Sequence, residues 1–138
     1  MKLSVILAAV LLAITGTALA QGSFADMEGH PQSAIVESLA EKGIVEGDSA
    51  GNFNPNADVT RGEFVTMLSR MMDLEQAPYD GRFQDVTQED YYAQSVSALA
   101  EKGIVEGSDG MFYPERTITH EEAVKMAVAC YEWQFGPM

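Results

Sequence analysis

The segment LAEKGIVEG stands at residues 39–47 and recurs letter for letter at residues 99–107. Gly43 and Gly103 within it are of the residue type that adopts the left-handed conformation just past the C-terminus of a helix. Apolar residues before each glycine are spaced for a helix, and the Ile-Val pair after it can turn inward. The repeated segment therefore predicts a helix end, a glycine stop and a return of the chain to the core.

The repeat extends well beyond these nine residues. Matching residues are separated by 59 positions at the start of each copy, by 60 in the shared segment and by 59 again after it. Self-similarity of this kind indicates two copies of one structural unit. We expect a first repeat at 21–74, a linker at 75–82 and a second repeat at 83–138. The matching pairs include Phe24 and Phe83, Asp26 and Asp85, Leu39 and Leu99, Phe53 and Phe112, Thr60 and Thr119, and Glu63 and Glu122.

Each unit opens with a predicted amphipathic helix. Its apolar positions are Ile35, Val36 and Leu39 in the first copy, and Val96 and Leu99 in the second. Spacings of three and four residues are typical of the apolar face of a helix.

A polar loop and a second helix complete the unit. Phe53 and Phe112, each two residues before a proline, are expected to hold the loop on the core. Thr60 with Glu63, and their counterparts in THEE, fit the capping box of a helix start. The sequence thus predicts an all-α protein, with two tandem helix–loop–helix repeats packed as a small helical bundle and little strand.

Residues 1–20, MKLSVILAAVLLAITGTALA, have the features of a secretory signal peptide. A lysine precedes a short apolar run, which ends in an A-x-A cleavage site. The run is short for a bilayer, which requires about 20 residues. We expect cleavage after Ala20, export, and no membrane insertion afterwards.

Composition limits the classes of function that the chain can have. A net charge of −13 repels nucleic acid and anionic lipid, so we expect neither as a partner. The single cysteine, Cys130, lies in an apolar-periodic stretch, which favours a buried thiol over a reactive one. The sequence offers no glycine-rich phosphate loop and no paired Cys/His metal spacing. We therefore expect no enzyme, no catalytic residue, no metal site and no cofactor.

The order F-x-D-[VM], apolar helix, G-I-V-x-G, D-G-x-F-x-P and [IV]-T-[RH]-x-E resembles the S-layer homology (SLH) domain, twice over nearly all of the chain after residue 20. The resemblance implies an all-α fold in which typical members assemble three repeats around a pseudo-threefold axis. It also implies grooves between repeats that hold exported proteins on the cell envelope. The implied ligand is a pyruvylated secondary cell-wall polymer in Gram-positive bacteria, or modified peptidoglycan in some outer-membrane-bearing lineages.

The resemblance also implies the ligand-binding residues. Arg61 occupies the arginine position of the family's T-R-A-E motif, where a guanidinium suits the carboxylate of a pyruvyl ketal. Alternatively, Arg61 pairs within the chain and binds nothing. We expect it to be exposed, so that its removal leaves the fold intact. The second copy has a largely neutral His120 at this position, which predicts a weak, pH-sensitive or inactive second groove. The expected ligand-binding residues are Arg61, Thr60, Glu63, Tyr91, Tyr92 and His120.

These expectations converge on a module that binds an anionic cell-wall glycan or peptidoglycan-linked polymer without a covalent bond. It would lie at the cell wall or cell surface, or at the periplasmic face of the envelope. The alternative is a protein–protein module that docks to SLH-containing chains or to itself, because no third repeat follows Trp133 in the sequence. A calcium site in the first loop is a weaker alternative, because the spacing of its oxygen donors does not match a calcium-binding loop. Those donors are Asp48, Asn52, Asn54 and Asp58.

Overall fold

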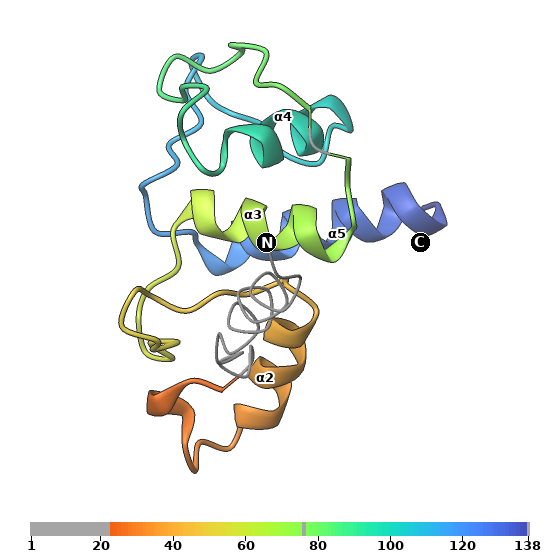
Figure 1. The fold of residues 1–138 in the computed structure, drawn as a ribbon. Helices are drawn as coiled ribbons and strands as arrows, with labels where there is room; N and C mark the ends of the chain where they lie inside the picture. The colour runs from red at the N-terminus through yellow and green to blue at the C-terminus, as the bar shows by residue number, and fades with distance from the viewer. Residues whose placement is uncertain (1–22, 76, 138) are drawn as a thin grey trace, which may run out of the picture.

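The computed structural model describes residues 23–75 and 77–137, so the predicted signal peptide lies outside the described residues. Within these residues the chain is helical and forms no strand, apart from isolated bridges at Thr60–Thr117 and Ser108–Met111. The all-α prediction is confirmed. No helix among these residues is long and apolar enough to cross a membrane. The elements are the 3-10 turn η1 (Ala25–Met27), α2 (Ser33–Glu41), α3 (Arg61–Met71), α4 (Ala93–Glu101) and α5 (His120–Phe135) (Figure 1).

The repeated segment ends its helix as predicted. Gly43 has a φ of +68°, and its amide donates to the carbonyl of Ala40 at 2.9 Å. The amide of Ile44 reaches back to the carbonyl of Leu39 at 2.9 Å. This pair of bonds is the Schellman motif, which satisfies carbonyls at a helix C-terminus and brings two apolar side chains together. The same two bonds recur around Gly103, which also has a φ of +68°.

An aspartate near the start of each repeat fixes the loop. In the second repeat the Asp85 carboxylate accepts the amides of Phe112 and Tyr113 at 2.7 and 2.6 Å. Asp26 accepts the amides of Phe53 and Asn54 in the same way, at 2.8 and 2.6 Å. Each loop phenylalanine also lies against the opening phenylalanine of its own repeat, with ring centroids 5.5 Å apart in both copies.

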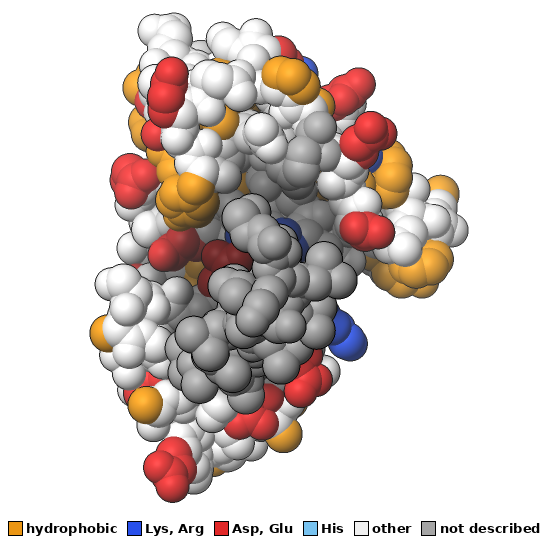
Figure 2. All heavy atoms as spheres, viewed as in Figure 1, with side chains coloured by type: hydrophobic (Ala, Val, Ile, Leu, Met, Phe, Trp, Pro, Cys, Tyr) orange, Lys and Arg blue, Asp and Glu red, His pale blue; other side chains and the backbone are white. Residues whose placement is uncertain are grey.

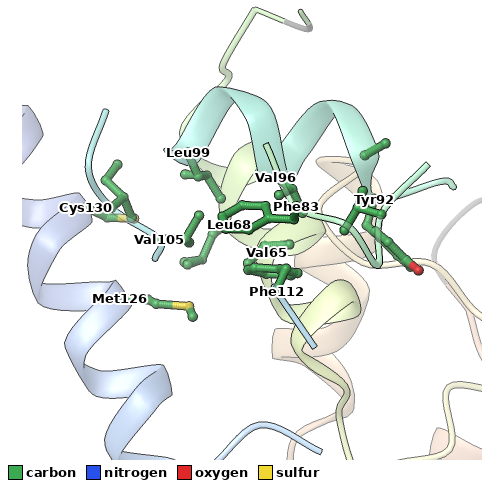
Figure 3. Packing of buried hydrophobic residues seen from close by; sticks show 13 residues of the cluster. Val65, Leu68, Phe83, Tyr92, Val96, Leu99, Val105, Phe112, Met126 and Cys130 are labelled. Atoms are coloured by element: carbon green, nitrogen blue, oxygen red, sulfur yellow. The ribbon is translucent and has the colours of Figure 1, made fainter. Parts of the chain in front are cut away.

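The helix α3 contributes to two apolar cores of unequal size. Val65 and Leu68 join the larger core, which belongs mainly to the second repeat (Figure 3). Met67, on another face of α3, packs against the smaller core of the first repeat. Figure 1 shows α3 and α5 across the middle of the molecule, with α2 on one side and α4 on the other. The first repeat therefore depends on α3 for its connection to the main core.

Two predictions about single side chains have different outcomes. Cys130 is buried as expected, and this burial raises the pKa of its thiol. Ile35, which was grouped with the apolar face of the first helix, is 63% exposed, whereas its neighbour Val36 is buried.

We predict that Gly43→Ala lowers the free energy of unfolding by about 1 kcal/mol, because alanine is strained at positive φ. An added Cβ has open space around it, so backbone strain is the only cost. Denaturant unfolding measures the change, and Gly43→Asn should recover part of it, because asparagine tolerates this conformation. Equal stability of the alanine variant and the wild type would contradict the predicted strain.

Candidate binding grooves and the junction between the repeats

The first turn of α3 is bound to the second repeat through the backbone. The amide of Arg61 donates to the carbonyl of Arg116, and the amide of Gly62 donates to the carbonyl of Pro114, both at 2.9 Å. The first amides of a helix have no acceptor within the helix itself. Here the loop of the other repeat supplies those acceptors, so the start of α3 is satisfied only when the two repeats are together.

The side chain of Arg61 extends this junction. Its Nε donates to the carbonyl of Phe112 at 3.0 Å, and its Nη2 donates to the carbonyl of Glu106 at 3.2 Å. Its Nη1 pairs with the Glu122 carboxylate at 3.1 Å, and its guanidinium carbon lies 4.7 Å from the centre of the Phe112 ring. All these partners belong to the second repeat. The arginine therefore joins the two repeats by hydrogen bonds, an ion pair and a cation–π contact.

The expectation that Arg61 is exposed is wrong, because its side chain is only 6% exposed. The alternative, in which it pairs within the chain, describes its contacts: it pairs with Glu122 at the start of α5. Burial lowers the pKa of Arg61 while Glu122 acts to raise it, and a guanidinium remains protonated under such shifts. Loss of Arg61 would therefore disturb the fold.

Glu122 is shared between two arginines. Arg116 reaches the same carboxylate oxygen as Arg61. Burial acts to raise the pKa of Glu122, but the Arg116 hydrogen bond, the Thr119 amide and the Arg61 charge outweigh it and lower the pKa to about 2. The carboxylate is therefore held in its charged form at neutral pH.

Glycine at position 62 allows α3 to approach Tyr92 closely. A Cβ at this position would lie 2.7 Å from the ring of Tyr92. That ring is 5% exposed at the edge of the main core, with its hydroxyl donating to Glu115 at 3.1 Å (Figure 3). Tyr92, one of the expected ligand-binding residues, therefore has its ring packed in the core and does not offer an open surface to a ligand. Tyr91 beside it is 65% exposed and available.

A first groove of about 460 Å³ lies between the start of α3 and the loops of the second repeat. Arg61 lines its wall, together with the more exposed cations Arg116 and Lys125. The charged and aromatic side chains that line it are Arg61, Glu106, Tyr113, Arg116, Glu122 and Lys125.

A second groove of about 450 Å³ occupies the corresponding place in the first repeat. Tyr91 of the second repeat contributes to it, and Arg70 is its only cationic lining residue. Four carboxylates line the same groove: Glu46, Asp48, Asp58 and Glu63.

The expected ligand-binding residues are divided between the two grooves. Arg61 lines the first and Tyr91 lines the second, so the structure does not place them in one site. Thr60 and Glu63 form the predicted capping box, as do their counterparts before α5. Exposed His120 lies at the start of α5, and neither it nor Thr60 lines a groove.

Arg116 and Lys125 line the first groove but were not among the residues predicted from the sequence. Their counterparts in the first repeat are Ala57 and Thr66. The second copy has cations at these two positions and lacks those that match Arg61 and Arg70, and this change of position was the signal that could have identified them. Charge differences between the copies therefore carry information that the shared motifs do not.

We predict that Arg61→Ala lowers the free energy of unfolding by more than about 2 kcal/mol, because the carbonyls of Phe112 and Glu106 lose their donor and Glu122 loses one of its two arginines. The matched control is Arg70→Ala on the same helix, which loses only an exposed pair with Glu46 and should cost less than about 1 kcal/mol. Denaturant unfolding measures both. Equal, small losses would show that Arg61 is not structural.

We predict that the contribution of Glu122 to stability depends on pH. Its folded pKa lies below its ordinary value of 4.5, at about 2, so the contribution is complete above 4.5 and is lost as the pH falls towards 2. Glu122→Gln should therefore be less stable than the wild type at pH 7, with a difference that shrinks below about pH 4.5. Thermal unfolding at several pH values tests this, and a difference independent of pH would contradict it.

Comparison with known proteins gives two matches to one family model. The model of the S-layer homology domain matches residues 23–65 and 82–124. Among relatives, an amylopullulanase of Thermoanaerobacterium thermosulfurigenes is 36% identical over 110 residues, 80% of this chain and 6% of the relative. The Surface-layer 125 kDa protein of Lysinibacillus sphaericus is 36% identical over 110 residues, 79% of this chain and 9% of the relative.

A middle cell wall protein of Brevibacillus brevis is 30% identical over 134 residues, 91% of this chain and 13% of the relative. The chain thus spans only a small part of relatives that include both enzymes and surface-layer proteins. Because the family model matches both repeats, over more than half of the chain, this chain belongs to the S-layer homology domain family.

Proposed function

We propose that this chain is a non-enzymatic module that anchors to the cell envelope by binding an anionic wall glycan in the first groove. The observation that carries the proposal is the concentration of cations in that groove, in a chain whose net charge is −13. Relatives named as surface-layer and cell wall proteins support a location at the cell surface.

The charges favour the first groove over the second for an anion. Three cations and two carboxylates line the first, whereas one cation and four carboxylates line the second. Because nearby like charges repel a carboxylate ligand, the second groove is the poorer site for it. The charged residues of the first groove are Arg61, Arg116, Lys125, Glu106 and Glu122.

The cations of the first groove would act at different depths. The side chains of Arg116 and Lys125 are 46% and 74% exposed, so they can reach a bound carboxylate such as that of a pyruvyl ketal. Arg61 lies in the wall, where its charge would favour an anion while its guanidinium holds the junction. Tyr113, 40% exposed, offers an aromatic surface for a sugar ring.

We predict that the double variant Arg116→Ala/Lys125→Ala loses glycan binding by at least about tenfold, because it removes two charge-assisted contacts. The measurement is co-sedimentation of the purified chain with cell-wall sacculi. The same assay on sacculi stripped of their secondary polymer and ketals by mild acid should show binding lost for the wild type.

The matched control is Arg70→Ala/Lys102→Ala, which removes the same charge from positions outside the first groove. It should bind intact sacculi like the wild type. Failure of the wild type to bind intact sacculi would contradict the anchoring function. Equal loss in both double variants would contradict the placement of the site.

A further inference from the structure

The face of α3 that packs against the second repeat has an exposed counterpart on α5. Val65 is fully buried, whereas Val124, 59 positions later, is 48% exposed. Leu68 is 5% exposed, whereas its counterpart Ala127 lies on the surface. The face continues to Tyr131, which is 50% exposed. In the first repeat this helix face packs against the second repeat. On α5 of the second repeat the same face is not covered by any of the described residues.

The partner surface shows the reverse pattern. Ser95 of α4, the helix that packs against α3, is 3% exposed, whereas its counterpart in α2, Ile35, is 63% exposed. Ala98 is 2% exposed, and its counterpart Ser38 is exposed. Ile35 is exposed to solvent at the position where the second repeat has a buried serine. This exposed apolar side chain indicates that the face of α2 is suited to contact another protein surface.

Backbone amides that are paired at the start of α3 have unpaired counterparts at the start of α5 among the described residues. The amides of Arg61 and Gly62 donate to carbonyls of the second repeat. For the corresponding amides of His120 and Glu121, the described residues provide no acceptor. The carbonyls that correspond to those acceptors belong to Pro55 and Ala57 in the loop of the first repeat, and both residues line the second groove.

We propose that this chain associates with a second copy of itself, with the α5 face of one copy docked on the α2 face of the other. The docked start of α5 would meet the loop of the partner's first repeat as α3 meets the loop of the second repeat. The faces of α3 and α4 already pair within the chain. The open faces of α5 and α2 are their counterparts, which is why a second copy fits.

The two helix pairs differ in opposite directions: one helix has a smaller residue where the other has a larger one. The pair α3 and α4 has a large Leu68 and a small Ser95, whereas α5 has a small Ala127 and α2 has a large Ile35. The residue of α5 that matches Gly62 is Glu121. The residue before α2 that matches Tyr92 is Gln32, which is uncharged. No like-charge pair therefore falls at that central position. Figure 2 shows hydrophobic side chains on the surface at the end where α5 projects.

The contact joins two different faces, so it is heterologous and leaves one open face on each end of a pair. Association therefore gives either a closed ring or a longer chain of copies. Salt should favour it, because the copies repel one another through their net charge of −13. The contact does not depend on a glycan ligand, so its failure would leave the proposed anchoring function intact.

The first test is the molar mass of the purified chain by light scattering over a concentration range of about a hundredfold. We expect the mass to rise above that of one chain. Ile35→Glu and Val124→Glu each place a charge in the contact and should weaken association by about tenfold or more. Both residues are exposed in the single chain, so the circular dichroism spectrum of each variant should stay that of the wild type.

The decisive test is to mix the two variants. Ile35→Glu retains an intact α5 face and Val124→Glu retains an intact α2 face, so each alone should be monomeric while the mixture forms a pair. Trp133→Glu is the matched control, since it lies nine positions from Val124, about 180° around the same helix, and is similarly exposed at 51%. It should associate like the wild type.

Three results would overturn the proposal. The first is a wild type that stays monomeric at every concentration, which would leave these faces to another protein or to further repeats. The second is a mixture of the two variants that stays monomeric. The third is association that Ile35→Glu and Val124→Glu weaken no more than Trp133→Glu does.

Discussion

The structure depends on the ion pair between Arg61 and Glu122, which joins the start of α3 to the start of α5. A buried guanidinium is costly unless its donors are satisfied, and here the second repeat supplies both the carboxylate and two backbone carbonyls. The first amides of α3 are satisfied in the same place. The two repeats are therefore bound by polar groups that neither repeat can satisfy alone.

This junction gives the two repeats different roles. The second repeat holds the larger core, and α3 of the first repeat completes it. The first repeat has a small core of its own, which is linked to the rest of the molecule through α3. The same asymmetry separates the grooves: the cations gather where the second repeat meets Arg61, and the carboxylates gather in the first repeat. One motif, used twice, thus produces one groove suited to anions and one that is not.

Local features could be predicted from the sequence because short-range chemistry decides them. The glycine stop at Gly43 and the capping box of Thr60 and Glu63 involve residues within a few positions of one another, and both formed as expected. The burial of Arg61 and the exposure of Ile35 depend on which face of each repeat meets its neighbour. That packing is not encoded in the repeat motif, since matching positions of the motif are covered in one copy and open in the other. The predicted ligand-binding roles of Tyr91 and His120 remain predictions.

The most direct test of the central junction is native-state hydrogen exchange at the amides of Arg61 and Gly62. Amides in the first turn of an ordinary helix exchange quickly because they have no acceptor within the helix. If the junction makes the two repeats one cooperative unit, these two amides should exchange only on global unfolding, with the same free energy as the amides of Val96 and Leu99 in the main core. Rapid exchange at Arg61 and Gly62, while the amides of α4 stay protected, would show that the repeats separate without unfolding and would contradict this account.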